Sequence, residues 1–186
     1  MSERSEHYDL RDGYVYDVTV KGADTTFWKE ITGTLTVASN KLRLNADRAA
    51  SYIQHIFGMY VFFVNVPTNP AASDARVFGL RNPGDATRGG AYFDFDSDGV
   101  FSTITYDEFA NQEKTVVTWD SDWSGAETRY AIRWEPDLVR FYVNEVVKAT
   151  HTSRIGKIAQ AIDVNNGNAD NLDIGVIEVR GAKTII

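Results

Sequence analysis

The chain of 186 residues contains no cysteine, and this absence removes several kinds of chemistry at once. Without thiols the protein forms no disulfide, thiolate zinc site or iron–sulfur cluster, and it has no cysteine nucleophile. Histidine is also scarce, with only His7, His55 and His151 present. Because His55 and His151 have no acidic or histidine partner at metal-ligand spacing, we expect them to lie in loops rather than to bind a metal.

Basic residues are outnumbered by acidic ones, 19 lysines and arginines against 26 aspartates and glutamates, which gives a formal net charge of −7 and a pI near 4.9. Nucleic-acid phosphates and anionic membrane surfaces attract basic proteins, so we expect neither nucleic acid nor membrane as a partner. Long apolar runs are missing as well, because no window approaches the roughly 18 consecutive apolar residues that a transmembrane helix needs.

The first residues, MSERSEHYDL, are charged from the third position and lack the apolar stretch of a secretory signal peptide. We therefore expect the chain to be made in the cytoplasm and not exported by the general secretory route.

Proline and glycine are few, with 4 and 14 residues, and no linker or repeat interrupts the chain, which favours one domain spanning residues 1–186. With 43% hydrophobic and 12% aromatic residues, that domain has enough apolar side chains for a large core.

Apolar residues alternate with polar ones in many short segments rich in β-branched and aromatic side chains, a pattern typical of strands. Turn-forming residues at Ala38-Ser39-Asn40 and at Asp98-Gly99 indicate hairpins. Residues 46–55 lack the alternation, and we expect them to be irregular or briefly helical. The pattern predicts an all-β fold, a two-sheet antiparallel sandwich or jelly roll. The predicted strands are residues 14–20, 31–37, 41–45, 58–66, 91–96, 100–106, 115–119, 130–135, 138–144, 146–150 and 172–180.

One segment, residues 130–144 (YAIRWEPDLVRFYVN), resembles a hairpin of the concanavalin A-like lectin/glucanase superfamily, most closely that of laminarinase-type family-sixteen glycoside hydrolases. The resemblance covers about residues 14–182 and leaves residues 1–13 as an N-terminal arm. It implies a jelly roll of two antiparallel sheets, one of them concave and facing the ligand. Four shorter segments resemble strands of the same family in the same chain order: residues 40–45 (NKLRLN), 58–67 (GMYVFFVNVP), 77–80 (VFGL) and 172–180 (LDIGVIEVR).

In these hydrolases the strand after the segment matched by residues 77–80 carries Glu-x-Asp-x-x-Glu or Glu-x-Asp-x-Glu. The first Glu is the nucleophile, the Asp assists it and the last Glu is the acid/base, a pair that retaining chemistry holds about 5–5.5 Å apart. In this chain Tyr92 falls at the nucleophile position, Asp94 at the assisting position, and Asp96 or Ser97 at the acid/base position. Because no glutamate is present in this segment, the resemblance implies that hydrolase activity is lost.

Alternation along this strand predicts that Phe93 and Phe95 enter the core, while Tyr92, Asp94 and Asp96 share the opposite face. Two carboxylates on one face can shift each other's pKa and yield an acid and a base. Asp94 and Asp96 are therefore the residual candidates for a catalytic pair, although two solvated acids beside a turn are the simpler interpretation.

The run DFDSDG at residues 94–99 also matches the start of a calcium-binding loop, with oxygen ligands at alternate positions before a glycine. The glutamate expected at the end of such a loop is replaced by Thr105, and a hairpin turn explains the same residues, so we prefer the hairpin. Asp94, Asp96 and Asp98 are weak calcium candidates only. We expect no cofactor, with a structural calcium ion left open.

Trp119 and Trp123 flank two aspartates and would share a face if the chain were extended. An aromatic surface beside carboxylates suits a sugar, because the ring contacts its apolar face while the carboxylates accept hydrogen bonds from its hydroxyls. The candidate ligand-binding residues are therefore Tyr92, Asp94, Asp96, Trp119 and Trp123. Burial of one or both tryptophans in the sandwich is an equally weighted alternative.

Three functions fit these observations. The preferred hypothesis is a non-catalytic structural or interaction module of a surface assembly, such as a virion, with protein partners or self-assembly. The alternative is a glycan-binding, lectin-like module that uses the concave face. A divergent glycoside hydrolase that works through Asp94 and Asp96 is the third hypothesis, disfavoured because the glutamate pair is missing.

Overall fold

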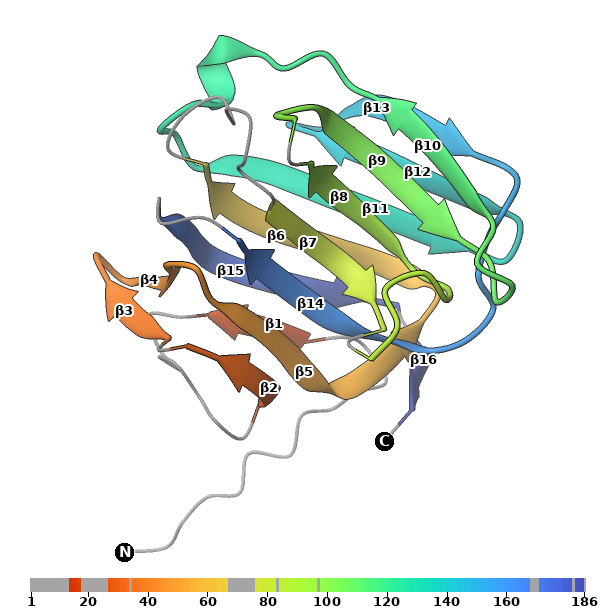
Figure 1. Ribbon diagram of the computed structural model, residues 1–186, viewed down its shortest axis with the longest axis horizontal. Coiled ribbons are helices and arrows are strands. Elements are labelled where there is room, and N and C mark those ends of the chain that lie inside the picture. Colours follow the sequence, from red (N-terminus) through yellow and green to blue (C-terminus); the bar gives the residue numbers. More distant parts are fainter. Residues whose placement is uncertain are drawn as a thin grey trace, which may run out of the picture.

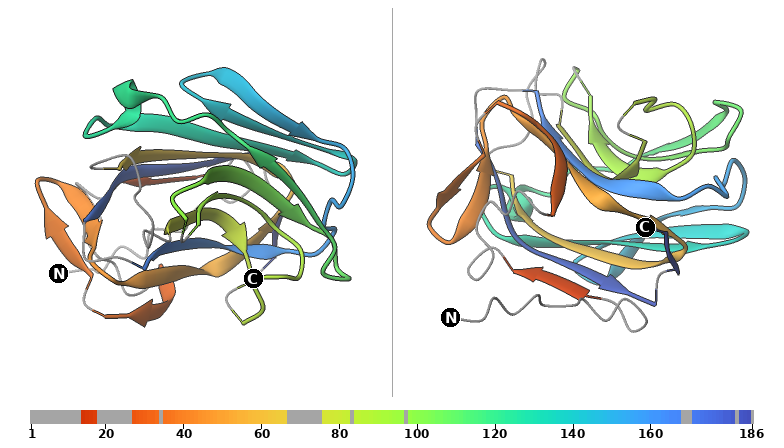
Figure 2. Two further views of the ribbon diagram at one scale, coloured as in Figure 1. Left: turned by 45° about the horizontal axis from the view of Figure 1, so that its top comes forward. Right: turned by 90° about the horizontal axis from the view of Figure 1, so that it is seen from below.

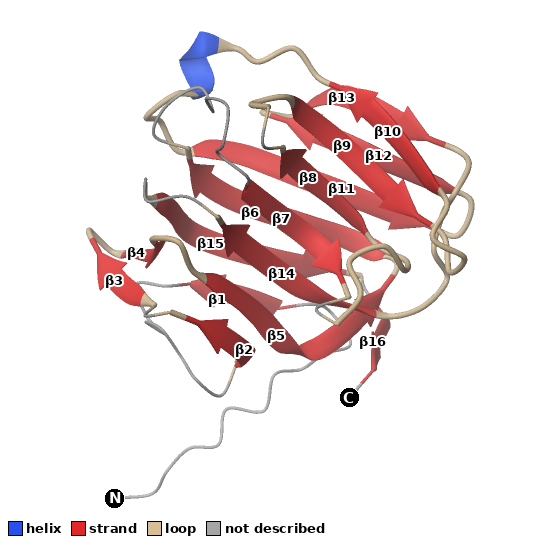
Figure 3. Cartoon of the chain, viewed as in Figure 1, coloured by secondary structure: helices blue, strands red, loops and turns tan. Residues whose placement is uncertain are grey.

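The computed structural model describes residues 14–17, 27–33, 35–66, 76–82, 84–96, 98–167, 171–181 and 183–185, and these form two antiparallel eight-stranded sheets packed as two layers (Figure 1, Figure 2). In this part of the chain, helix is confined to one 3-10 turn, η1 (Ser121–Trp123) (Figure 3). No helix among these residues has the length and apolar character needed to cross a membrane. The predicted all-β sandwich is confirmed, whereas the expected arm at residues 1–13 lies outside the described residues.

The two sheets have the crossing connections of a jelly roll, since consecutive strands such as β5 and β6 lie in opposite layers. The first sheet has the order β13 (Val146–His151), β12 (Leu138–Val143), β11 (Thr128–Glu135), β6 (Gly58–Asn65), β15 (Leu172–Arg180), β4 (Lys41–Leu44) and β3 (Thr36–Ala38), with β1 (Tyr14–Asp17) paired to β15. The second sheet has the order β10 (Gln112–Val116), β9 (Phe101–Tyr106), β8 (Ala91–Phe95), β7 (Arg76–Arg81), β14 (Gln160–Asn166), β5 (Arg48–Ile56) and β16 (Lys183–Ile185), with β2 (Trp28–Thr32) paired to β5.

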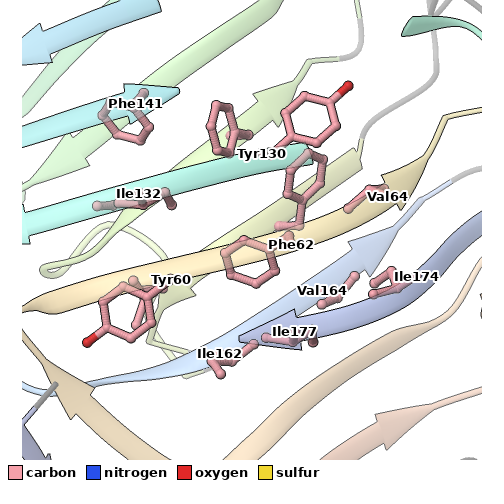
Figure 4. Packing of buried hydrophobic residues seen from close by; sticks show 14 of the residues in the cluster. Tyr60, Phe62, Val64, Tyr130, Ile132, Phe141, Ile162, Val164, Ile174 and Ile177 are labelled. Atoms are coloured by element: carbon pink, nitrogen blue, oxygen red, sulfur yellow. The ribbon is translucent and has the colours of Figure 1, made fainter. Parts of the chain in front are cut away.

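The core lies between the two sheets and consists largely of aromatic side chains. Alternate residues of the facing strands point inward, so that Tyr60, Phe62 and Tyr130 are fully buried (Figure 4). Phe93 is also fully buried. The rings of Phe78 and Tyr130 meet edge to face with centroids 4.9 Å apart. Burial of a phenylalanine such as Phe62 contributes about 1.5–3 kcal/mol relative to leaving it in water. This core holds the second sheet in place, and the opposite face of that sheet remains available for other contacts.

The hairpin turns expected from the sequence are present. Ser39 and Asn40 join β3 to β4 in left-handed conformations with φ of 53° and 61°. The turn between β8 and β9 ends at Gly99, whose φ is 76°. The turn of the β12–β13 hairpin is fixed to β11, because Asn144 donates its amide to the Arg129 carbonyl at 2.8 Å and its side chain accepts from the Arg129 amide at 3.1 Å.

The expectation for residues 46–55 is wrong, because most of them belong to β5. This strand is paired with β14 on one side and with β2 and β16 on the other. Its sequence shows little alternation because small side chains such as Ala49 and Ala50 are buried on both faces. Pairing with neighbouring strands, rather than a local pattern, therefore keeps this segment extended.

Other elements also differ from the sequence prediction. The strand expected at residues 31–37 is divided at Gly33, whose φ is 83°, so that β2 joins the second sheet and β3 the first. The strand expected at residues 115–119 is instead β10, which ends at Val116. Strand β14 was not anticipated, although its buried residues Ile162 and Val164 alternate with a charged one.

Candidate functional site

The strand that the sequence resemblance matches to the catalytic strand of the hydrolases is β8, in the second sheet. Phe93 and Phe95 are fully buried in the core between the sheets. Tyr92 and Asp94 point to the other side of β8, which we call the outer face of the second sheet. The alternation predicted for these four residues is confirmed. Ser97, the alternative acid/base position, lies outside the described residues.

Apolar side chains cover the outer face around Tyr92. Tyr92, Val77 and Ile104, from three neighbouring strands, form a separate small cluster with Tyr106 packed against it. The rings of Tyr92 and Tyr106 are nearly parallel, with centroids 6.3 Å apart, and only 5% of Tyr92 is exposed. Burial raises the pKa of Tyr92. Within the described residues no pocket is found on this face, so any ligand there would contact an open surface and not an enclosed cavity.

A charged group lies next to this cluster. Asp163, from β14, is fully buried and accepts hydrogen bonds from Nε of Arg48 at 2.9 Å and Nε of Arg81 at 2.5 Å. The guanidinium carbon of Arg81 lies 5.7 Å from the centroid of the Tyr92 ring. Arg81 is therefore held between a carboxylate and an aromatic ring. The sequence prediction missed Asp163, although its position between Ile162 and Val164 is the alternation that marks a strand.

Asp94 differs from the other acids of this face in the hydrogen bonding of its carboxylate. The side chain is partly buried, and among the described residues no hydrogen-bond donor reaches it. Loss of solvent raises the pKa of Asp94, and the nearby charge of Asp96 raises it further, while Lys114 and Arg81 act in the opposite direction. Asp94 therefore presents an acceptor that its surroundings leave unused.

Asp96 differs from Asp94, because both of its carboxylate oxygens accept hydrogen bonds. One oxygen accepts from the amides of Asp98 at 3.1 Å and Val100 at 3.0 Å, and the other from Nζ of Lys114 at 3.1 Å. Partial burial acts to raise the pKa of Asp96, but the hydrogen bond from Val100 and the contact with Lys114 outweigh it, and the pKa is lowered. Asp96 stabilises the turn and is not free for a ligand.

The weak calcium candidates do not converge on one point. Asp94 lies on the sheet face, Asp96 closes the turn, and Asp98 is exposed at the tip of the hairpin. Among the described residues no group of three or more histidine, aspartate or glutamate side chains is placed to hold a metal ion. The hairpin interpretation of residues 94–99 agrees with the pairing of β8 and β9.

The two tryptophans belong to the core and its rim. Trp123 is only 4% exposed, and Trp119 is partly buried against Phe95, with ring centroids 5.3 Å apart. The prediction that they share a face assumed an extended chain, but the segment between them forms η1, and their rings meet nearly perpendicular at 5.4 Å. Trp123 has no ring face left for a sugar, so the outer face around Asp94 does not include it.

Both described histidines are buried in strands, so the expectation that they lie in loops is wrong. His55 lies in β5, and loss of solvent lowers its pKa to about 4. His151 lies in β13, with Nδ1 at 2.9 Å from the Thr105 hydroxyl and Nε2 at 3.0 Å from the Thr115 hydroxyl. These contacts join an edge strand of the first sheet to β9 and β10 of the second.

Solved structures with a similar fold were found by comparison. The β-glucanase of Bacillus licheniformis matches with a TM-score of 0.70 at 14% sequence identity, over 91% of this chain and 98% of its own. A prokaryotic β-1,3-1,4-glucanase (lichenase) from a mouse hindgut metagenome matches with a TM-score of 0.74 at 11% identity, over 91% and 99%. The laminarinase catalytic domain of Thermotoga maritima matches with a TM-score of 0.66 at 11% identity, over 94% and 100%.

These likenesses establish the fold. The chain has the concanavalin A-like jelly roll that family-sixteen glycoside hydrolases share, as the hairpin at residues 130–144 predicted. No protein-family model matches the sequence, and no curated protein matches it either. At identities of 11–14% the fold alone is shared, and function has to be argued from the side chains of this chain.

Proposed function

We propose that this chain is a non-catalytic carbohydrate-binding domain whose ligand contacts the outer face of the second sheet around Asp94. The observation that carries the proposal is the uncommitted carboxylate of Asp94, which is partly buried and accepts no hydrogen bond from the described residues. A partly exposed carboxylate that accepts no hydrogen bond from the protein relies on water, and a ligand that brings hydroxyl groups can replace that water.

Side chains around Tyr92, two positions before Asp94 on the same face of β8, supply the other groups that a sugar needs. The Nε atom of Arg81 is used by Asp163, while its terminal nitrogens make no hydrogen bond to the described residues and can donate to a hydroxyl oxygen. Tyr106 is partly exposed beside Tyr92 and offers an aromatic surface to the C–H groups of a pyranose ring. An acceptor, a donor and an aromatic ring thus lie on adjacent strands. The fold supports the same ligand class, because the similar structures are glucanases and a laminarinase.

The proposal that the domain is non-catalytic has separate support. Retaining hydrolysis requires two carboxyl groups about 5–5.5 Å apart, one of them able to give and take a proton. The position of the nucleophile is occupied by Tyr92, whose raised pKa keeps its hydroxyl protonated. Asp96 is engaged by two amides and Lys114, which leaves Asp94 without a second free carboxylate on β8.

The experiment is calorimetric titration with laminarin and mixed-linkage β-glucan, accompanied by an assay for released reducing sugar. The wild-type protein binds at least one glucan and releases no sugar, and Asp94→Ala weakens binding about tenfold, the loss expected for a charged hydrogen-bond acceptor. Asp137→Ala is the matched control, because that exposed carboxylate lies in the β11–β12 turn. If neither glucan binds, the proposal fails. Sugar release that Asp94→Asn abolishes would instead support the hydrolase hypothesis.

A second candidate function is a self-assembling module of a surface assembly, such as a virion. The observation that favours it is Phe109, which is 83% exposed at the tip of the β9–β10 hairpin. The tip is rigid, because one carboxylate oxygen of Asp107 accepts from the amides of Phe109 and Asn111, each at 2.9 Å. A large exposed aromatic side chain can serve as the central anchor of a protein contact. This function is compatible with glycan binding, because the tip lies apart from Asp94 at the end of β9.

A further inference from the structure

An ion pair crosses the outer face of the second sheet beside Asp94. Lys114 lies on β10 and Asp96 follows β8, two strands away, and Nζ of Lys114 contacts a carboxylate oxygen of Asp96 at 3.1 Å. In the pairing with β9, Lys114 lies opposite Ile104, whereas the amide of Asp96 donates to the carbonyl of Val100. This ion pair, which we call the Lys114–Asp96 bridge, therefore passes diagonally over β9 between residues 104 and 100.

Ser102 is the residue of β9 that lies under the bridge. Its neighbours Phe101 and Thr103 point into the core. Ser102 therefore faces outward, directly opposite Asp94 on β8. It is nevertheless fully buried, and its hydroxyl has no hydrogen-bond partner in the described part of the chain. A buried hydroxyl without a partner lowers the stability of the folded state, so its presence here calls for an explanation.

Two polar groups without a partner thus lie side by side. Among the described residues the carboxylate of Asp94 has no donor, and the hydroxyl of Ser102 can both donate and accept. Residues paired in this way on antiparallel strands have Cβ atoms about 4.5–5.5 Å apart, so one hydroxyl group of a ligand can reach both. In the free protein the bridge separates the Ser102 hydroxyl from solvent.

The Lys114–Asp96 bridge can open at small cost. The side chains of Lys114 and Asp96 keep 33% and 27% of their surface exposed, and ion pairs that water reaches contribute little to stability. Asp96 retains the hydrogen bonds from two backbone amides when the ammonium leaves, so the turn after β8 stays intact. Burial raises the pKa of Asp94 and the charge of Lys114 opposes this rise, which indicates that the ammonium lies near both acids.

We propose that the Lys114–Asp96 bridge is a gate over the ligand site and that Ser102 is a binding residue beneath it. When a ligand reaches Asp94, the bridge opens, and the Ser102 hydroxyl bonds to the same ligand hydroxyl group that donates to Asp94. This inference rests on the proposed carbohydrate-binding function and adds the regulation of the site to it. The buried hydroxyl then finds its partner only in the bound state.

The gate is tested by calorimetric titration with laminarin and mixed-linkage β-glucan at low and high sodium chloride, about 0.05 M and 0.5 M. Both glucans are uncharged, and salt screens the exposed bridge, so we expect the wild-type affinity to rise about twofold to threefold with salt. Lys114→Met keeps the aliphatic stem without the charge, binds at least as tightly at low salt and loses the salt dependence. Arg133→Met, which breaks an exposed ion pair with Glu135 on the first sheet, is the matched control and keeps it.

The role of Ser102 is tested by comparing affinity with stability in Ser102→Ala. Affinity for the same glucans falls about fivefold, the loss expected for one hydrogen bond between neutral groups. The melting temperature stays constant or rises, because the hydroxyl that is removed has no partner in the free protein. Ser51→Ala is the matched control on this sheet. The buried Ser51 hydroxyl donates to the carbonyl of Ile53 at 2.7 Å and accepts from the amide of Ile162 at 3.0 Å, so its loss lowers the melting temperature.

Each outcome decides one part of the inference. An affinity that does not change with salt, or a salt dependence that Lys114→Met retains, overturns the gate. An unchanged affinity in Ser102→Ala, or a fall in its melting temperature like that of Ser51→Ala, overturns the contact beneath the bridge. In these cases a loss of affinity in Asp94→Ala leaves the proposed function intact. Absence of binding to both glucans at both salt concentrations overturns the proposed function and the gate together.

Discussion

At the scale of single residues, similar side chains on one short segment have different chemical roles. Asp94 and Asp96 are two positions apart on a hairpin, but the amides of the turn and Lys114 engage Asp96, while Asp94 has no donor among the described residues. Their pKa values shift in opposite directions for this reason. The composition of a segment therefore does not reveal which acid is available to a ligand, because availability depends on hydrogen bonds from elsewhere.

Buried histidine makes the stability of this protein depend on pH. Burial lowers the pKa of His55 from its ordinary value of 6.5 to about 4, and also lowers that of His151. The folded state therefore favours the neutral imidazole, and its contribution is complete above pH 6.5 and lost as the pH falls toward 4. We expect the melting temperature to be constant between about pH 7 and 8 and to fall between about pH 6.5 and 4.5, with a cost of up to about 3 kcal/mol for His55.

The measurement is thermal unfolding by circular dichroism across this pH range, for the wild type and for His55→Phe. The variant has no group to protonate at this position, so the difference between its melting temperatures at pH 7 and pH 4.5 is smaller than that of the wild type. An identical pH dependence in the two proteins would show that His55 does not control the acid sensitivity.

At the scale of elements, the two sheets are joined by polar as well as apolar contacts. His151 of β13 reaches the hydroxyls of Thr103, Thr105 and Thr115 on two strands of the opposite sheet. We expect His151→Leu to lower the free energy of unfolding by about 3 kcal/mol, because it leaves these buried hydroxyls without their partner. Urea denaturation measures this loss, with Thr150→Leu, an exposed neighbour on β13, as the control. A loss below about 1 kcal/mol would mean that the hydroxyls find other partners.

At the scale of the whole molecule, a net charge of −7 is compatible with both proposed functions, because neither a neutral glucan nor an apolar protein contact requires a basic surface. The exposed Phe109 makes self-assembly testable. We expect sedimentation velocity and native mass spectrometry to show an oligomer at micromolar concentration that Phe109→Ser converts to monomer. Val37→Ser, on edge strand β3, is the control, since this side chain is also exposed. A homogeneous wild-type monomer would contradict self-assembly.

Local patterns in the sequence are sufficient to predict the all-β fold, the turns at Ser39-Asn40 and Gly99, and the inward and outward sides of β8. The sequence also determined that the glutamate pair of the resembled hydrolases is absent. These features follow from local rules, because alternation and turn formation depend on a few consecutive residues.

Which side chains meet on the outer face depends instead on the pairing of strands that are distant in the sequence. Asp163 reaches Arg81 from a strand 82 positions further along the chain. The same long-range packing buries Trp123 in the core. Such contacts depend on how strands pair across the sheet and pack between sheets, and no local pattern in the sequence specifies that arrangement.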